Sequence, residues 1–154
     1  MRISSVRPLA LNLDDMRYLS GSAEDYTGYL IKQADLLFTR YNGTPSLVGV
    51  CAVVPAIARE IVHPDKVIRC RMLADFGSPN YVAIASNVGS SRRFLSKRIR
   101  TTAGQAGVSG SDIKETPIPF PPNSEQDEIA ELIEDQLSVI EHLEADLEAK
   151  LKSA

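Results

Sequence analysis

A cluster of basic side chains gives this chain its clearest chemical signal. The cluster consists of Arg92, Arg93, Lys97, Arg98 and Arg100. We expect a helix over residues 90–100, on which Arg93, Lys97 and Arg100 share one face because they are four and three residues apart. Guanidinium and ammonium groups bind the phosphates of nucleic acids, so the cluster indicates a phosphate-binding face. An ordinary solvated helix face would carry the same charges, and this alternative stays open.

Two further segments contain side chains of the types that read base edges. In the turn that starts at Thr39, Arg40 is suited to guanine and Asn42 to adenine, with Tyr41 between them. The loop 101–111 is rich in small residues, which would let its backbone approach a duplex. Its polar candidates for phosphate or base contacts are Thr101, Thr102, Gln105 and Ser109. The pair Asn42-Gly43 is also common in simple hairpin turns, so by itself it indicates little.

The remaining titratable residues do not form a pattern typical of catalysis or of a metal site. His63 and His142 have no ligand at metal-binding spacing, and the carboxylate pairs have no His or Lys partner nearby in the sequence. The sequence has no nucleophile elbow, no P-loop and no dinucleotide fingerprint. Cys51 and Cys70 lie in apolar segments, which favours buried, reduced thiols. We therefore expect a chain that is not an enzyme by itself and has no cofactor or metal.

Periodicity and turn residues predict the elements that position these side chains. Strands are predicted at 2–6, 36–39, 48–54 and 66–72, and helices at 22–29, 78–85 and 90–100. Residues 118–122 are expected to be extended, because prolines fix their own φ and restrict the residue before them. The predicted fold class is α+β, with a mixed globular domain over residues 1–122.

The charge balance changes at residue 123. Residues 1–122 carry a balance of +5 and residues 123–154 a balance of −8. Apolar residues of the tail recur with the spacing of one helix face, which predicts a long helix over 124–152. Asn123 is expected to cap this helix, with Gln126 in capping-box position. The residues expected at a helix interface are Ile129, Ile133, Ile140, Leu143 and Leu147.

The length of this helix favours pairing with a second helix. It would be ~43 Å long at 1.5 Å per residue, whereas a domain of this size has a radius of gyration of ~14 Å. A coiled-coil type of dimer or a docked partner is therefore expected. An amphipathic helix that lies along its own domain is the alternative.

Three segments of the sequence, taken in order, share motifs with one protein family. Residues 34–43 read ADLLFTRYNG, with Ala34 where the family usually has Gly, and residues 100–113 are similar to the segment before the family's last strand. Residues 118–129 match the motif Ile-Pro-x-Pro-Pro-x-x-Glu-Gln-x-x-Ile. Together they resemble the target recognition domain and long helix of a type I restriction-modification specificity subunit, and the resemblance covers essentially the whole chain.

The resemblance implies a function and a set of partners. A full specificity subunit has two recognition domains, held apart by two long antiparallel helices, and each domain reads half of a bipartite site in double-stranded DNA. Modification (methyltransferase) subunits clamp the helices and methylate adenine with S-adenosylmethionine, while a restriction subunit adds ATP-driven translocation and cleavage. By this resemblance the chain is a half-subunit or fragment that reads one half-site.

The beginning of the chain departs from the family pattern, in which recognition domains start further upstream. We therefore expect a domain truncated at its N-terminus, whose exposed edge favours a homodimer. No apolar run approaches the length of a membrane span and no signal-peptide core is present, so a cytoplasmic location is expected. Two alternatives stay open: a homodimeric helical interaction module that binds no DNA, and the recognition portion of a fused restriction-methylation enzyme.

Overall fold

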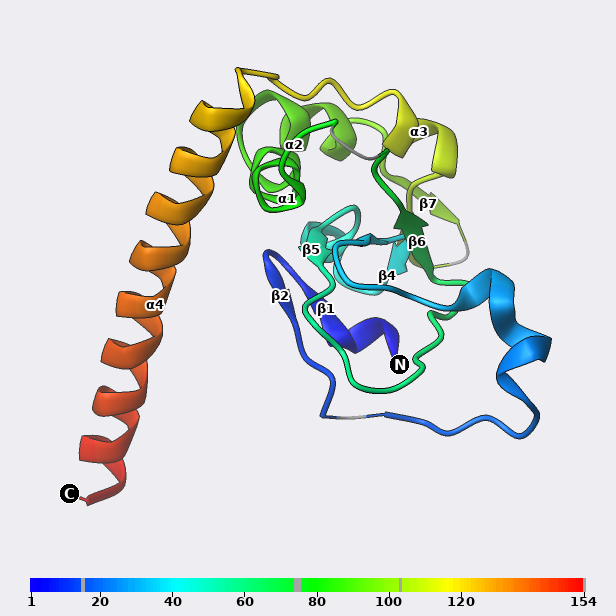
Figure 1. The fold of residues 1–154 in the computed structure, drawn as a ribbon, viewed down its shortest axis with the longest axis horizontal. Helices are drawn as coiled ribbons and strands as arrows, with labels where there is room; N and C mark the ends of the chain where they lie inside the picture. The colour runs from blue at the N-terminus through cyan, green and yellow to red at the C-terminus, as the bar shows by residue number, and fades with distance from the viewer. Residues whose placement is uncertain (15, 74–75, 103, 154) are drawn as a thin grey trace.

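Short strands and helices form a body from which one long helix extends (Figure 1). The structure, a computed structural model, describes residues 1–14, 16–73, 76–102 and 104–153. The strands are β1 (Val6–Arg7), β2 (Ala10–Leu11), β3 (Leu36–Thr39), β4 (Tyr41–Asn42), β5 (Cys51–Val53), β6 (Val67–Cys70), β7 (Arg100–Thr102) and β8 (Gln105–Gly107). The α-helices are α1 (Pro79–Asn87), α2 (Gly89–Ser96), α3 (Gly110–Lys114) and α4 (Asn123–Ser153), and 3-10 turns cover Ile3–Ser5, Ala23–Tyr29 and Pro45–Leu47. The predicted α+β class is confirmed.

The central sheet is built around β3. Its order is β5-β3-β6, and both pairings are antiparallel. All four residues of β3 are buried, which is the pattern of a strand covered on both faces. Leu37 packs into a cluster with β1 and β5, while Leu36 and Phe38 pack into a second cluster under α1 and α2. The alternation of β3 therefore joins the two main cores.

Several predicted elements are shorter than expected. The strands predicted at 48–54 and 66–72 cover only Cys51–Val53 and Val67–Cys70, and the helix at 22–29 is a 3-10 turn. The predicted strand 2–6 is wrong over most of its length, because Ile3–Ser5 form a 3-10 turn and only Val6 enters a strand. Apolar composition placed the strands within 48–54 and 66–72 correctly, but long-range pairing with β3 decides where each of them ends.

The helix predicted at 90–100 is also wrong at its end. α2 stops at Ser96, and Arg100 begins β7. The segment expected as a loop, 101–111, contains the hairpin β7–β8 and the start of α3. The small residues of this segment therefore lie in paired strands and not in an open loop.

The long C-terminal helix is confirmed, with α4 covering Asn123–Ser153. Its first turns pack against α1, where Ala130 joins Tyr81, Ile84 and Ala85 in a third buried cluster. Beyond them it runs past the body and ends apart from it (Figure 1). Asn123 lies inside the helix, and the Gln126 side chain bonds to Ser78 and Pro121. No helix of the described residues is long and apolar enough to cross a bilayer.

Both cysteines are free thiols, as expected. Cys51 is fully buried in β5 and Cys70 is half-buried in β6, on opposite sides of β3. Burial raises the pKa of each thiol, which favours the protonated form.

Candidate nucleic-acid interface

A second sheet brings together the two sequence segments with base-reading side chains. β4 pairs with β8, which sets Tyr41 opposite Gly107, and β8 pairs with β7, which sets Arg100 opposite the same glycine. The carbonyl of Arg40 extends the contact, because it accepts a hydrogen bond from the N–H of Val108 at 3.0 Å. Segments that are far apart in the sequence are therefore hydrogen-bonded neighbours.

Glycine is required at position 107 by the close approach of Tyr41. A Cβ at this position would lie 2.3 Å from Cδ1 of Tyr41 and 3.2 Å from the carbonyl oxygen of Arg40. The ring of Tyr41 also lies under the guanidinium of Arg40, with 5.0 Å between Cζ and the ring centroid. This cation–π contact supports Arg40 from below. The missing side chain at Gly107 is thus what allows Tyr41 to hold Arg40 in place.

A pocket beside this sheet collects six of the predicted DNA-binding residues. It is lined by Arg40, Tyr41, Arg98, Arg100, Gln105 and Ser109, together with Gly107, Val108 and Asp112. Three of these side chains are guanidinium groups and one is a carboxylate, so the lining is net positive. A concave positive site with hydroxyl and amide groups suits a phosphate or a base edge.

Arg40, which lines this pocket, has a buried donor without a partner. Its Nε atom is the one buried side-chain nitrogen or oxygen of the described residues that has no hydrogen-bond partner. Buried donors in native proteins are almost always paired, so an unpaired one marks a place for a bound acceptor.

Arg98 is held between an aromatic ring and a carboxylate. Its Cζ lies 3.4 Å from the centroid of the Phe94 ring, and its Nε lies 3.7 Å from Oδ1 of Asp112. Both contacts restrict a long side chain that would otherwise lose entropy on binding. Arg98 is therefore presented to the pocket in one orientation.

Asp112 is a pocket residue that sequence reasoning missed. Its Oδ2 accepts hydrogen bonds from the backbone N–H and the hydroxyl of Ser109, at 2.8 and 2.6 Å, and its own N–H donates to the Ser109 hydroxyl. These bonds from Ser109, with Arg100 and Arg98 nearby, lower the pKa of Asp112. The pattern Ser-x-x-Asp at 109–112 is a capping-box signal that was present in the sequence.

Arg92 differs from the other basic residues because it serves the fold. Its guanidinium donates to the carbonyl oxygens of Val48 and Ser46, at 2.6 and 2.7 Å. Burial lowers its pKa. Arg92 therefore links α2 to the turn after β4 and holds these two elements together.

Arg93 and Lys97 are exposed near the end of α2 and remain available for phosphates. The expected common face with Arg100 is wrong, because Arg100 lies in β7 and not on the helix.

The other polar candidates differ in burial and in hydrogen-bond partners. Thr39 is fully buried, where its hydroxyl donates to the carbonyl of Leu47 and accepts from the N–H of Val50. Asn42 uses its Oδ1 to accept from the N–H of Thr44 at 2.9 Å, which closes the turn. Thr101 is exposed on β7, and the side chain of Thr102 lies outside the described residues. Thr39 is thus a structural residue of β3.

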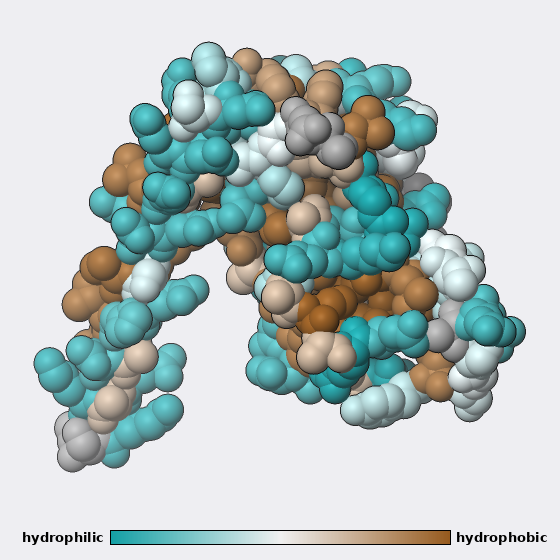
Figure 2. Space-filling view, in the orientation of Figure 1, coloured by the Kyte–Doolittle hydropathy of each residue, from teal (hydrophilic) through white to brown (hydrophobic). Residues whose placement is uncertain are grey.

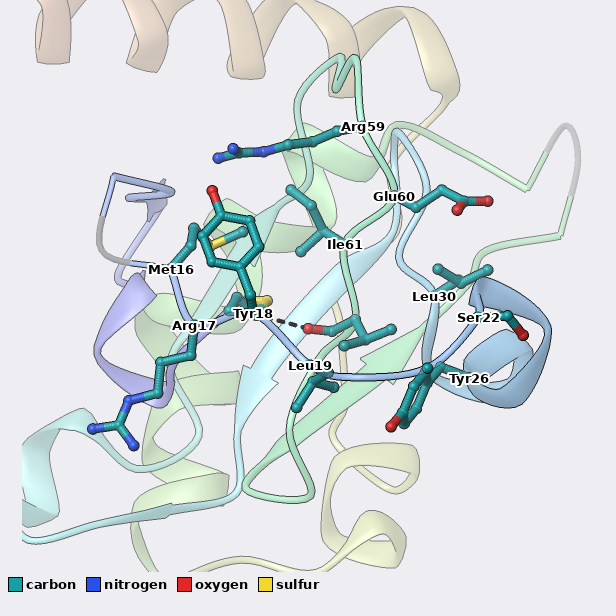
Figure 3. A pocket seen from close by; sticks show the side chains of 13 residues that line it. Met16, Arg17, Tyr18, Leu19, Ser22, Tyr26, Leu30, Arg59, Glu60 and Ile61 are labelled. Carbon is teal, nitrogen blue, oxygen red and sulfur yellow. Dashed lines mark hydrogen bonds between the residues drawn. The ribbon is translucent and has the colours of Figure 1, made fainter.

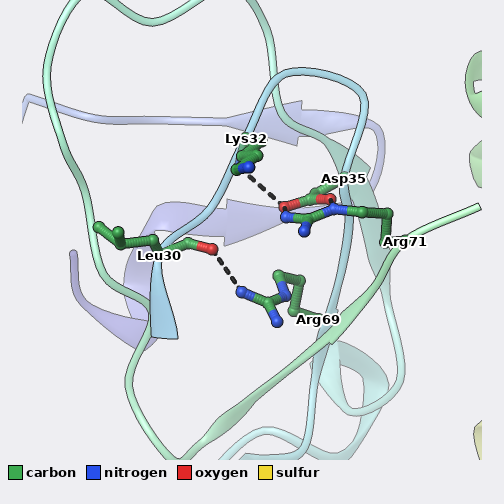
Figure 4. Close-up of polar contacts among 5 residues, drawn as sticks. All are labelled: Leu30, Lys32, Asp35, Arg69 and Arg71. Carbon is green, nitrogen blue, oxygen red and sulfur yellow. Dashed lines mark hydrogen bonds and ion pairs between the residues drawn. The ribbon is translucent and has the colours of Figure 1, made fainter. Parts of the chain in front are cut away.

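The turn that leads into β3 is fixed by a buried carboxylate. Asp35 is 1% exposed and accepts two hydrogen bonds from Arg71, both at 2.7 Å, and one from the N–H of Lys32 (Figure 4). The bond to Asp35 raises the pKa of Arg71. Ala34, beside it, has a φ of 67°, a conformation that favours glycine. The Asp-Leu-Leu motif therefore starts β3 in a defined direction.

A second pocket lies near the N-terminus, away from the basic residues of the sheet. Met16 and Tyr18 of one segment face Arg59 and Ile61 of another across it (Figure 3). The amino group of Met1 donates to the carbonyl of Val62 at 3.1 Å on its floor. The residues that line this pocket include none of the DNA-binding candidates.

The residues expected at a helix interface fall into two groups. Ile129 and Ile133 are partly buried against the third cluster, so the first part of α4 lies on its own domain. Ile140, Leu143 and Leu147 are 49%, 63% and 59% exposed. Figure 2 shows hydrophobic side chains along the side of the helix that faces away from the body. The distal half of α4 is therefore amphipathic without a partner in the described chain.

Comparisons with known proteins extend over nearly the whole chain. No protein-family model matches it. The specificity subunit of the type I restriction enzyme EcoKI from Escherichia coli strain K12 is 37% identical over 94% of this chain and 31% of its own length. The EcoEI specificity subunit of E. coli is 25% identical over 97% of the chain and 25% of its own length.

A third relative is the StySPI specificity subunit from Salmonella potsdam. It is 22% identical over 94% of this chain and 31% of its own length. The chain thus spans about a third or less of the curated relatives that it matches.

Proposed function

The chain belongs to the type I restriction-enzyme specificity subunits, and from this premise we propose that it recognises one half of a bipartite site in double-stranded DNA. In this proposal its body reads the DNA and α4 docks other subunits of a restriction-modification system. The chain itself contributes recognition rather than catalysis, and methyl transfer and cleavage belong to the modification and restriction subunits.

One observation carries the DNA-reading part. Residues that the sequence alone nominated, from segments around 40 and around 100, line a single positive pocket. Among the lining residues, Arg40 has a buried Nε that lacks an acceptor. A duplex presents phosphate oxygens and base acceptors of the kind that this donor needs.

The contacts suggest a division of labour among the side chains. Arg40, Asn42 and Gln105 are proposed to reach base edges. An arginine can form two hydrogen bonds with guanine, and the amide of Asn or Gln can form two with adenine. Arg93, Lys97, Arg98 and Arg100 are proposed to bind phosphates, with Thr101 and Ser109 as polar neighbours. The proposed role of Thr39, Tyr41 and Arg92 is to hold the DNA-contacting residues in place through contacts within the protein.

Binding to mixed-sequence duplex tests the phosphate role. We expect Arg100→Gln to weaken binding and to reduce the slope of log K against log salt by ~0.9, the value for one lost phosphate contact. Arg59→Gln, at an exposed arginine of the other pocket, is the matched control and should keep both values. Equal effects of the two substitutions would show that only net charge matters and would contradict this site.

The docking part rests on the distal half of α4. Its exposed stripe is apolar, which suits a helical partner that covers the stripe. Modification subunits or a second copy of this chain are the partners proposed. A chain that self-associates but binds no duplex would instead favour the homodimeric interaction module.

A further inference from the structure

The side chain of Gln126 is completely buried at the start of α4. Its Oε1 accepts from the N–H of Ser78 at 3.0 Å, and its Nε2 donates to the carbonyl of Pro121 at 2.8 Å. Nε2 also lies 3.5 Å from Oδ1 of Asn123. One amide therefore joins the residue that precedes α1, the extended segment that precedes α4, and α4 itself.

The space for this amide is created by a glycine. Gly77 has a φ of 119°, and a Cβ at this position would lie 2.7 Å from Oε1 of Gln126 and 2.8 Å from Cζ of Phe120. The Phe120 ring packs on Phe76, with 5.2 Å between the centroids. The backbone at 77 is thus shaped around one side chain of the segment before α4 and one of its first turn.

Further contacts align the next turns of α4 and then stop. The hydroxyl of Tyr81 donates to the carbonyl of Pro119 at 2.9 Å, and Nδ2 of Asn80 donates to Oε1 of Glu134 at 2.6 Å. Ala130 is buried against α1. From 134 to 152 every side chain is exposed. Only the first turns of α4 are therefore held by the body, and the longer remainder of the helix is exposed.

We propose that Gln126 is the positioning residue that fixes the direction of α4 relative to the recognition body. A helix extends about 40 Å beyond this point, so a tilt of about 10° would move its tip by about 7 Å. That displacement corresponds to about two base pairs at 3.4 Å each. Under the proposed function, on which this second step rests, Gln126 thereby sets the spacing at which the body meets DNA in an assembly.

Distances between two spin labels test the direction of the helix in the chain alone. Labels are placed at Asp65→Cys in the body and Ala145→Cys on α4, with Cys51→Ala and Cys70→Ser, and the labelled chain is diluted in unlabelled chain to remove intermolecular signals. We expect one narrow distance distribution for this background. Gln126→Met, which keeps the volume but loses the hydrogen bonds, should broaden or shift the distribution, and Gly77→Ala should do the same by displacing the amide.

Gln136→Met is the matched control, because Gln136 is exposed on the same helix, and it should leave the distribution unchanged. If Gln126→Met does not fold, Gln126→Asn shortens the reach of the amide and provides the same comparison. A variant at 126 that melts at a lower temperature but keeps the narrow distribution would overturn the inference, since a purely structural role predicts that result.

Binding to mixed-sequence duplex, measured on the same variants, separates this inference from the proposed function. Gln126 is not among the residues that line the positive pocket, so its variants should bind a short duplex as the unsubstituted chain does. If no variant binds duplex but the distances still change at 126 and not at 136, the helix direction is set by Gln126 and the DNA-reading function is wrong.

Discussion

Ala34 occupies a backbone conformation in which an L side chain is strained. Its φ is 67°, and such a conformation costs roughly 1–2 kcal/mol for a residue with a Cβ. We expect Ala34→Gly to raise the free energy of unfolding by about 1 kcal/mol, because it removes this strain. Chemical denaturation measures the change. Ala85→Gly in α1, which lacks a positive φ, should instead destabilise, and a loss of stability at both positions would contradict the strain.

Asp112 should make stability depend on pH. Its pKa is lowered in the folded state, so its contribution is present above the unfolded pKa and is lost as the pH falls through the folded pKa. We expect Asp112→Asn to cost about 1 kcal/mol at pH 7, the usual value of a capping interaction. The difference from the unsubstituted chain should shrink below about pH 4.

Thermal unfolding between pH 3 and pH 7 provides this measurement. Asp65→Asn, at an exposed turn, is the control and should change little at any pH. A difference for Asp112→Asn that stays constant across the range would mean that its ionised form is not what stabilises α3.

Residue types were readable from the sequence, but their partners were not. Arg40, Arg98 and Arg100 were named as DNA-binding candidates from their chemistry, and the structure places all three at one pocket, which the sequence did not predict. Arg92 has the same chemistry and lies in the same cluster, yet two carbonyl oxygens hold it inside the fold. Nothing local distinguishes these arginines, since the carbonyls come from residues more than forty positions away.

At the scale of elements, the pairing of β4 with β8 decides whether the pocket forms. Gly107→Ala would set a methyl group 2.3 Å from the Tyr41 ring, so the ring or the strand must move. We expect a loss of about 1–3 kcal/mol, typical of overpacking, and a weaker affinity for mixed-sequence duplex. Denaturation and duplex binding are measured together.

Gly43→Ala is the matched control for this element. Gly43 follows β4 directly, and a Cβ there would meet nothing within 4 Å. This substitution should leave both stability and duplex binding close to those of the unsubstituted chain. The same losses for both variants would show that the turn, and not the contact between Tyr41 and Gly107, controls the pocket.

Element positions were predicted better than element ends. A strand was predicted at 36–39 because three apolar residues are followed by the β-branched Thr39, and β3 covers these residues. The helix predicted to reach Arg100 fails because pairing with β8 draws residues 100–102 into a strand. That competition depends on a register between distant segments, which periodicity does not encode.

At the scale of the whole molecule, the distal half of α4 presents an exposed apolar stripe. Ile140→Asp would place a charge within its apolar stripe, where an unpaired charge is costly once covered. We expect the unsubstituted chain to form dimers at micromolar concentration and Ile140→Asp to shift them at least tenfold toward monomer. Sedimentation velocity measures the distribution.

Ser138→Asp introduces the same charge on the same helix, outside the residues predicted at the seam. It should leave the association unchanged. A monomer for the unsubstituted chain and for both variants, without binding to a modification subunit, would remove the assembly role from α4.

The long helix was the easiest large feature to predict, since its period repeats locally over about 30 residues. Where it stops resting on the body was not predictable, because Ile129 and Ile140 look alike in the sequence. Only the position of α1 makes the first a core residue and leaves the second exposed.

The two three-stranded sheets of the body share no strand, and this separation bears on how such a protein changes over time. β3, β5 and β6 form the centre of the two main cores, whereas β7 and β8 carry Arg100 and Gln105 at the pocket, with Ala106 of β8 joining one core. Substitutions of these outward side chains leave the ladder of the central sheet untouched. If the pocket reads DNA as proposed, single substitutions there would change the preferred target at little cost in stability, and different targets could be reached on an unchanged scaffold.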